Sequence, residues 1–319
     1  MAQHFLLSAA ARTLSLKAVF QDGEERAYER FCALRWPRCQ GRPICPICAG
    51  ERCYAISTWR RFKCAACQRQ FSVTSGTIFA SHKLSFVDLL AAICLFVNAL
   101  KGISALQLSR DLKVQYKTAF VLAHKLREAL AAETAGHMLG NVVEVDGAYF
   151  GGHVRPANFK DDRKDRRLLN NRSGKRCVVV AMRERGGRTL TQVSSQESEG
   201  VDFARRRLKP GSIVTSDEVA HWDLLSKDFP TERINHSDAY SRDGVHTNFA
   251  ESFFSRLRRM IRGQHHRVEA KYPNDYAAHA GWLEDHSRES NGQMAQRLIE
   301  NGLSAHFSRV WKGYWRRAG

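Results

Sequence analysis

Two Cys-x-x-Cys pairs constrain this chain more than any other feature of its sequence. Cys45 and Cys48 form the first pair and Cys64 and Cys67 the second, with fifteen residues between the pairs. Each pair can bring two thiolates to a metal from one tight turn, and this spacing lets a single tetrahedral zinc ion close a ribbon. We therefore predict a structural zinc ion held by these four cysteines.

The chain is also strongly basic. Its 319 residues include 50 Lys and Arg against 32 Asp and Glu, which leaves a formal net charge of +18. A balance of this size is typical of proteins that bind polyanions, and we expect the partner to be nucleic acid. Membrane binding is a weaker alternative, because the sequence has neither a basic amphipathic helix nor a run of about 18 apolar residues.

The segment between the cysteine pairs combines aromatic and basic side chains. A hairpin there would return the chain from the first pair to the second and carry the basic run on the ribbon. We predict that Arg60, Arg61 and Lys63 in this run bind DNA. Three further cysteines nearby form no Cys-x-x-Cys pair, and we expect none of them to be a ligand. They are Cys32, Cys39 and Cys53.

The cysteine content and the N-terminal residues favour a cytoplasmic protein. Nine cysteines, four of them assigned to zinc, leave an odd number and argue against a disulfide framework. The first residues lack the basic region and the long apolar region of a signal peptide. We therefore expect a cytoplasmic protein that is associated with the nucleoid.

Helical periodicity follows the cysteine pairs. Apolar residues recur at helical spacing across 86–100, which predicts a buried helix. Segments 102–112 and 116–130 then predict two helices joined by residues 113–115, as in a helix-turn-helix whose second helix enters the major groove. A plain helical hairpin is the alternative. The predicted DNA-binding residues at the start of the second helix are Gln115, Tyr116, Lys117 and Thr118.

From residue 141 onward, short β-branched runs alternate with helical segments, which predicts a mixed sheet flanked by helices. Asp146 and Asp217 each stand at the end of a predicted strand, and Glu251 lies on a helix predicted for 248–261. Three converging carboxylates would make an oxygen-only site, which Mg²⁺ or Mn²⁺ prefers and zinc does not. Two such ions could bind the attacking and leaving oxygens of a phosphodiester.

Glu144 is an alternative to Asp146, because residues two apart in a strand share a face. We favour Asp146 because Gly147, which follows it, leaves the backbone room to approach a ligand. Taken singly, an acid at a strand end is more often a turn or cap residue than a ligand. The hypothesis therefore depends on the combination of the three acids with their neighbours.

Three blocks of this sequence look like the catalytic blocks of DDE transposases from bacterial insertion sequences, and the zinc-ribbon ISXO-like group is the nearest kind. The blocks are residues 143–152, 214–217 and 245–259. Four further segments resemble the same group: 35–37, 70–79, 102–108 and, near the C-terminus, 308–315. The resemblance covers the chain from about residue 30 onward.

The resemblance implies an RNase H-like catalytic core in which Asp146 and Asp217 bind the catalytic metal and Glu251 is the third acid. It also implies that Arg258, two helical turns beyond Glu251, contacts DNA. Some members of the group use Asn as the third ligand, and Asn248 keeps that option open. We favour Glu251, because a carboxylate neutralises metal charge better than an amide does.

We interpret the chain as a multidomain α+β protein in which an N-terminal zinc ribbon and a helix-turn-helix precede an RNase H-like mixed α/β catalytic core. The expected segments are an N-terminal segment 1–40, a zinc ribbon 41–72, a helical DNA-binding domain 73–135, a catalytic domain 136–290 and a C-terminal tail 291–319.

The expected function is that of a DNA transposase that binds the terminal inverted repeats of its element, cleaves the ends and joins the 3′ hydroxyls to target DNA by two-metal phosphoryl transfer. The basic runs 155–176 and 256–267 would bind phosphates of the double-stranded DNA. Because two ends must be joined, we expect at least a dimer. The aromatic tail 307–317 would lie either in its interface or on its own core. A non-catalytic transposase-derived regulator and an RNase H-like nuclease are the alternatives.

Overall fold

The structure, a computed structural model, divides the chain into two compact units by its backbone contacts. Met1–Glu133 and His286–Gly319 form the first unit, and Thr134–Asp285 forms the second. The residues that the structure describes are 5–151, 157–164, 176–217, 220–234, 246–266, 268–269, 271–308, 310–311 and 313–314.

The two units group the segments expected from the sequence. The segments 1–40 and 41–72, almost all of 73–135 and the expected tail 291–319 all belong to the first unit. The division into five independently folding segments stays a prediction. Most of the basic run 155–176 lies outside the described residues.

The ribbon of the first unit is a small antiparallel sheet in the order β1-β2-β3. Its strands are β1 (Cys53–Ile56), β2 (Arg61–Cys64) and β3 (Gln70–Phe71), and helix α1 (Leu16–Arg35) precedes it. Trp36, just after α1, meets the ring of Phe62 at 5.6 Å, and Phe62 meets Phe71 at 5.6 Å. These buried rings give the ribbon a hydrophobic core of its own. A sheet this small needs such a core for stability, in addition to any metal ion that it binds.

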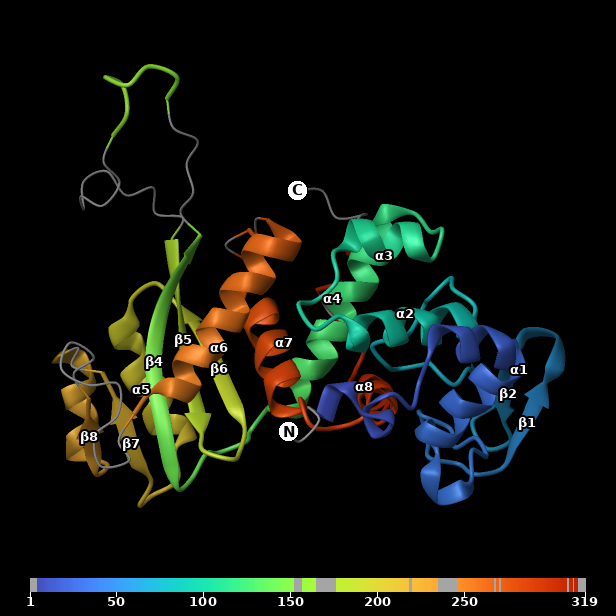
Figure 1. Cartoon of the computed structure of the whole chain (residues 1–319). Helices are drawn as coiled ribbons and strands as arrows, with labels where there is room; N and C mark the ends of the chain where they lie inside the picture. The colour runs from blue at the N-terminus through green and yellow to red at the C-terminus, as the bar shows by residue number, and fades with distance from the viewer. Residues whose placement is uncertain are drawn as a thin grey trace. The chain divides into compact units, whose positions relative to one another are not determined.

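The rest of the first unit is helical. The helices are α2 (Phe86–Asn98), α3 (Ala105–Asp111), α4 (Tyr116–Glu133) and α8 (Asn291–Ser304) (Figure 1). Serine side chains at Ser85, Ser104 and Ser290 accept a backbone amide in the first turns of α2, α3 and α8, as N-caps do. Most of α2 is buried between α1 and α8, which confirms the predicted buried helix in 86–100.

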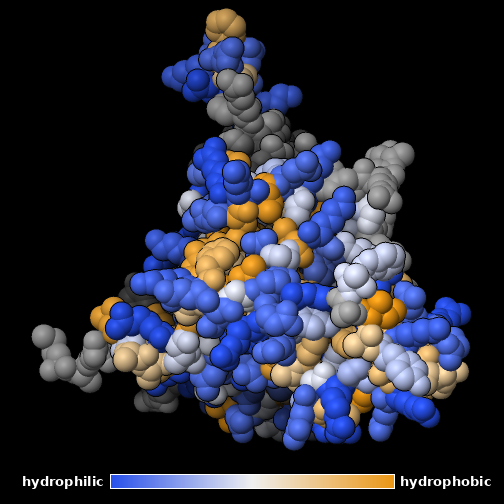
Figure 2. All heavy atoms as spheres, turned by 90° about the vertical axis from the view of Figure 1, so that its right-hand side faces the viewer, coloured by the Kyte–Doolittle hydropathy of each residue, from blue (hydrophilic) through white to orange (hydrophobic). Residues whose placement is uncertain are grey.

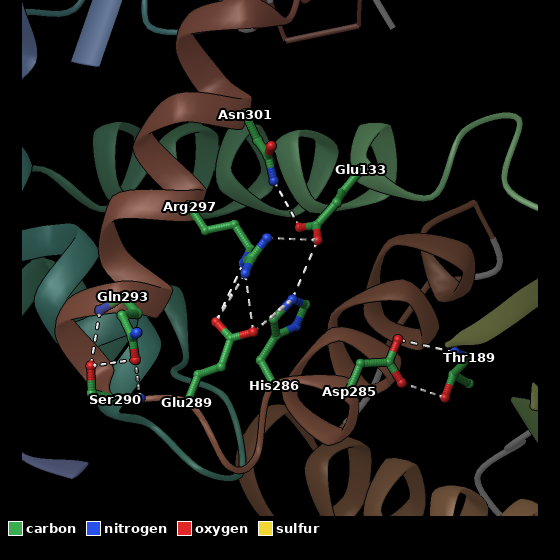
Figure 3. Close-up of polar contacts among 9 residues, drawn as sticks. All are labelled: Glu133, Thr189, Asp285, His286, Glu289, Ser290, Gln293, Arg297 and Asn301. Carbon is green, nitrogen blue, oxygen red and sulfur yellow. Dashed lines mark hydrogen bonds and ion pairs between the residues drawn. The ribbon is translucent and has the colours of Figure 1, made fainter. Parts of the chain in front are cut away.

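A polar cluster joins the end of α4 to α8 within this unit (Figure 3). Glu133 accepts a hydrogen bond from Asn301 Nδ2 at 2.8 Å and lies 3.3 Å from the Nε2 of the buried His286. Arg297 donates to Glu289 at 3.1 Å. The last residue of the first stretch, Glu133, and the first residue of the second, His286, are thereby held together.

The second unit is built on a five-stranded sheet in the order β6-β5-β4-β7-β8. Its strands are β4 (Val142–Gly151), β5 (Arg176–Glu184), β6 (Thr189–Ser194), β7 (Ile213–Ser216) and β8 (Thr231–Arg233). β4 pairs antiparallel with β5 and parallel with β7, β5 pairs antiparallel with β6, and β7 pairs parallel with β8. The sheet is therefore mixed, and the α+β class with an N-terminal ribbon is confirmed.

Helical segments pack against this sheet (Figure 1). The 3₁₀ segment Ala220–Lys227 and α5 (Gly200–Arg207) contribute Trp222 and Val201 to a core that contains Val145 of β4. The helices α6 (Asn248–Arg259) and α7 (Pro273–Asp285) also pack on strands of the sheet. Asp285, at the end of α7, accepts hydrogen bonds from the amide and hydroxyl of Thr189 at 3.0 and 2.7 Å (Figure 3).

Hydrophilic side chains cover most of the face shown in Figure 2, and hydrophobic side chains form patches among them. Among the described residues, no helix has the length and apolarity needed to cross a membrane.

Candidate active site and DNA-binding surface

The four paired cysteines converge at one point of the ribbon. The Sγ atoms of Cys45, Cys48, Cys64 and Cys67 all lie within 4.8 Å of one another, and no other group of possible metal ligands of this kind occurs among the described residues. Four soft sulfur ligands at these separations fit one tetrahedral zinc ion. The prediction from the sequence spacing that these four cysteines form one cluster is therefore confirmed.

The two cysteine turns have the same backbone shape. The amide of Ala49 donates to the carbonyl of Cys45 at 2.9 Å, and the amide of Gln68 donates to that of Cys64 at 3.0 Å. Ala49 and Gln68 occupy equivalent positions and both have a left-handed φ, 56° and 58°. Cys53 lies close by, but its thiol donates to the carbonyl of Gly50 at 3.5 Å. The matched turns present their sulfurs to a common centre.

Parallel pairing of β4 with β7 brings Asp146 and Asp217 together. Val145 of β4 pairs with Ser216 of β7, so the residues that follow them stand next in register on neighbouring strands. The predicted pair of acids therefore lies at one place. β7 ends just before Asp217, as predicted, but β4 continues to Gly151, so Asp146 lies within its strand and the prediction that it ends a strand is wrong.

The charge of the third acid, Glu251, acts on Asp146 as well. The pKa of Asp146 is raised to about 7, first by burial and then by the negative charges of Asp217, Glu197 and Glu251. The amide of Gly147 opposes this shift by donating to Asp146 Oδ1 at 2.7 Å. A divalent cation would neutralise this carboxylate charge, but in the described residues no three of these acids bring ligand oxygens within 4.8 Å of one another.

Glu144, the alternative to Asp146, has a different position. Its side chain is fully buried, and its Oε2 accepts the amides of Phe249 and Ala250 at 2.8 and 3.1 Å. Its Oε1 accepts from Arg185 Nε at 3.1 Å. Both oxygens are therefore engaged, and Glu144 anchors the N-terminus of α6, which carries Glu251 in its first turn.

Three residues of α6 named from the sequence are exposed. Asn248 is the first residue of the helix, Glu251 follows one turn later, and Arg258 lies two turns further along the same face with its guanidinium 5.8 Å from the ring of Phe254. Of these, Glu251 is the one whose charge acts on Asp146.

Sequence reasoning missed one acid of this site, Glu197. A Cβ at Gly147 would lie only 2.6 Å from Glu197 Cγ, so the carboxylate fills the space that the glycine leaves. The glycine predicts room for an external ligand there, whereas Glu197 occupies that space. The only sequence signal was the glycine beside Asp146, and it does not say which residue approaches.

Comparison with known proteins then identifies the family. Residues 138–285 match the model of the ISXO2-like transposase domain, and residues 23–70 match that of the transposase zinc-ribbon domain. The chain belongs to the ISXO2-like transposases. No curated protein matches it. Among solved structures, the crystal structure of the Mos1 strand transfer complex is similar at 10% identity and a TM-score of 0.23, over 67% of this chain and 78% of that one.

In this ISXO2-like transposase, the residues predicted to read DNA lie at the start of α4. Gln115, Tyr116 and Lys117 are exposed and Thr118 is half-buried, while α3 packs on α4. The turn is closed by the amide of Thr118, which donates to the carbonyl of Gln115 at 2.9 Å. The two predicted helices thus exist, with the named side chains accessible.

The basic run of the ribbon divides into two kinds of residue. Arg61 and Lys63 are exposed on β2. Arg60 instead donates to Glu25 at 2.9 Å and lies 3.3 Å from Glu24, both on α1, with its guanidinium over the ring of Tyr28. Arg60 therefore ties the ribbon to α1, which the sequence pattern could not distinguish from a DNA contact.

The C-terminal aromatic residues pack on the protein itself. Trp311 is 3% exposed, stacks on His124 of α4 at 4.3 Å and meets Phe120 at 5.8 Å. Tyr314 lies 6.1 Å from Phe120. Trp311 is therefore part of the core of the first unit, and the last residues of the tail lie outside the described residues.

Proposed function

We propose that this chain is a DNA transposase that cleaves the ends of its element and joins the 3′ hydroxyls to target DNA with Mg²⁺ or Mn²⁺. The observation that carries the proposal is the placement of Asp146 and Asp217 next in register on the neighbouring strands β4 and β7, with the charge of Glu251 also acting on Asp146, whose pKa is raised to about 7 chiefly by burial. The match to the ISXO2-like transposase domain spans all three acids.

The three carboxylates would hold the catalytic ions. Bound divalent ions supply charge stabilisation at the attacking and leaving oxygens of a phosphodiester. Asp146 and Asp217 sit on a rigid sheet, and Glu144 fixes the start of the helix that carries Glu251, so the ligands are positioned before DNA binds. Arg258 on the same helix would bind a DNA phosphate. No Ser or Cys nucleophile is required.

The sheet topology supports an RNase H-like core for this function. Two antiparallel strands stand on one side of β4, and two strands parallel to it stand on the other. The candidate acids come from the central strand, its parallel neighbour and a helix that packs on β4.

Recognition of the terminal inverted repeats is assigned to the first unit. We propose that α3 and α4 form a helix-turn-helix whose residues Gln115, Tyr116, Lys117 and Thr118 contact bases, and that Arg61 and Lys63 of the ribbon contact phosphates. The zinc ion would stabilise the ribbon. The protein would act on DNA in the cytoplasm, at the nucleoid, as at least a dimer.

A strand-transfer assay tests the proposal. Purified protein is incubated with labelled duplexes that carry the inverted repeats flanking its gene, with target plasmid and with Mg²⁺ or EDTA. Cleaved ends and joined products should form only with the metal. Asp146→Asn, Asp217→Asn and Glu251→Gln should abolish both products and retain end binding, whereas Glu232→Gln, an exposed acid of β8, should behave as wild type.

Each alternative reading gives a different result in the same assay. End binding without cleavage by the wild-type protein would indicate a regulator, and cleavage without joining would indicate a nuclease. An inactive Asn248→Ala beside an active Glu251→Gln would make Asn248 the third ligand.

A further inference from the structure

A polar pocket lies beside the ribbon of the first unit, where the chain leaves β3 toward α2. It has a volume of about 440 Å³ and is lined by Arg61 of β2, by the loop that contains Ser72, Thr74 and Ser75, and by His82. None of the described residues that line it is acidic. The lining therefore offers a guanidinium and several hydroxyls, without an opposing negative charge.

The three hydroxyls of this loop contact one another. Ser72 Oγ lies 3.3 Å from Thr74 Oγ1 and 3.2 Å from Ser75 Oγ, and Ser75 Oγ also accepts the amide of Ser72 at 2.8 Å. Three hydroxyls carry three protons, and the two contacts between them use two. A hydroxyl proton also rotates to suit its partner. The cluster can therefore donate a hydrogen bond to an acceptor that enters the pocket.

The loop that carries these hydroxyls is fixed. Thr74 is 3% exposed, and its carbonyl accepts the amide and the hydroxyl of Thr77 at 3.2 and 2.7 Å. Gly76, which also lines the pocket, has a left-handed φ of 77° that glycine adopts without strain. His82 is held as well, because its Nδ1 donates to the carbonyl of Leu84 at 2.8 Å. Donors that are already ordered lose little entropy when a ligand binds.

The pocket borders the residues proposed to contact DNA. Arg61 belongs to it directly. Residues 80–82 line both this pocket and a second one of about 280 Å³, whose lining includes Lys83, Lys117 and Thr118. Lys117 and Thr118 are in the first turn of α4. A DNA strand that contacts both the ribbon and the start of α4 would therefore pass over the pocket.

We propose that this pocket, formed by Arg61, Ser72, Thr74 and Ser75, binds one phosphate of the DNA backbone between the ribbon and the first turn of α4. A phosphodiester oxygen is negatively charged and only accepts hydrogen bonds, which matches a guanidinium beside hydroxyl donors. The inference rests on the proposed function, because it requires the first unit to bind end DNA. It also gives a role to the segment 70–79, which has no part in the candidate catalytic site.

Two substitutions of Thr74 test the role of the hydroxyl. Thr74→Val keeps the shape of the side chain and removes the hydroxyl, so the full-length protein should bind the labelled inverted-repeat duplex at least about fivefold more weakly in fluorescence anisotropy. Thr74→Ser keeps the hydroxyl and loses a methyl group, and it should bind as wild type. A role in packing alone predicts the reverse order, and that order overturns the inference.

Ethylation of single phosphates in the same duplex identifies the phosphate that the pocket binds. An ethyl group removes the charge of one phosphate, so ethylation at the bound position should interfere with binding of the wild-type protein. Arg61→Ala and Thr74→Val should reduce the interference at one and the same phosphate, because both residues line one pocket. Arg69→Ala removes an exposed cation of the same ribbon outside the pocket and should leave that phosphate unaffected. Effects of the first two variants at different phosphates, or at none, overturn the inference.

The outcome for the proposed function is distinguishable. A wild-type protein that binds the duplex, beside a Thr74→Val variant that binds it equally well, contradicts only the role of the pocket. A wild-type protein that does not bind the duplex contradicts the proposed recognition of the ends and this inference together. Far-UV circular dichroism and urea unfolding confirm that each variant is folded.

Discussion

The carboxylate of Glu144 in β4 accepts the backbone amide of Phe249 in α6 at 2.8 Å. Through this contact the central strand holds the N-terminus of the helix that carries the third acid, Glu251. The bond is buried, because Glu144 has no exposed surface, and Arg185 shares the carboxylate at 3.1 Å. The position of Glu251 therefore depends on Glu144.

Replacing Glu144 should lower stability and activity together. Glu144→Gln leaves Arg185 facing a neutral amide and turns one acceptor into a donor, so the free energy of unfolding should fall by about 2–4 kcal/mol. End cleavage should fall as well, because α6 loses its anchor. Urea unfolding and the strand-transfer assay measure both effects. Stability equal to that of Glu232→Gln would show that the contact contributes nothing.

Zinc should be structural. Metal analysis of the purified protein should find one zinc per chain, and Cys64→Ser should lose it, because three sulfurs no longer complete a tetrahedral site. The ribbon should unfold and end binding should drop, while the second unit stays folded. Cys53→Ser should retain the zinc, since Cys53 lies outside the cluster. Full end binding by Cys64→Ser would contradict the assignment.

The metal-free protein should lose stability as the pH rises. The pKa of Asp146 is about 7 in the folded chain against a usual value of 3.8, so the folded state binds the extra proton between these values. Stability is therefore highest near the lower value and falls through the higher one. In EDTA we expect a loss on the order of 2 kcal/mol between about pH 5 and 8.

Asp146→Asn is the matched variant for this effect, because it has the shape of the protonated acid. It should unfold at higher urea concentrations than wild type at pH 8 in EDTA, and Mg²⁺ should stabilise only the wild-type protein. Parallel pH profiles for the two proteins would mean that Asp146 ionises normally.

Neighbouring arginines of the ribbon should differ in their effect on DNA binding. Arg61→Ala removes an exposed cation, so end binding should weaken and the slope of log affinity against log salt should decrease by about one. Arg60→Ala should leave this slope unchanged and destabilise the ribbon, because Arg60 pairs with Glu24 and Glu25. Salt titrations by fluorescence anisotropy measure both variants.

The active form should be at least a dimer on DNA, and Trp311 should not be part of its interface. Trp311→Ala should lower the stability of the first unit by about 3 kcal/mol, since it empties a buried aromatic site on α4. The mass of the complex with end DNA, measured by light scattering, should stay that of a dimer or larger. A monomer on DNA in the intact protein would contradict the dimer prediction.

The sequence by itself determined those features that depend on local spacing. The zinc cluster follows from two short turns, because each Cys-x-x-Cys pair fixes two ligands within four residues. The buried helix α2 and the strands β4 and β7 follow from apolar periodicity, which places side chains on one face whatever the partner is. The acids Asp146, Asp217 and Glu251 were found through the resemblance of their surroundings to a known family.

Only the tertiary structure decided which side chains meet over long separations. Glu144 and Asp146 are both acidic and lie on the same face of β4. Only the packing of α6 shows that the Glu144 carboxylate accepts a hydrogen bond from a backbone amide of that helix. The approach of Glu197 to Gly147 depends on how a rigid turn packs across the sheet. Arg60 differs from Arg61 only because α1 lies beside the ribbon. Such contacts are set by register and packing, and neither is encoded in the spacing of nearby residues.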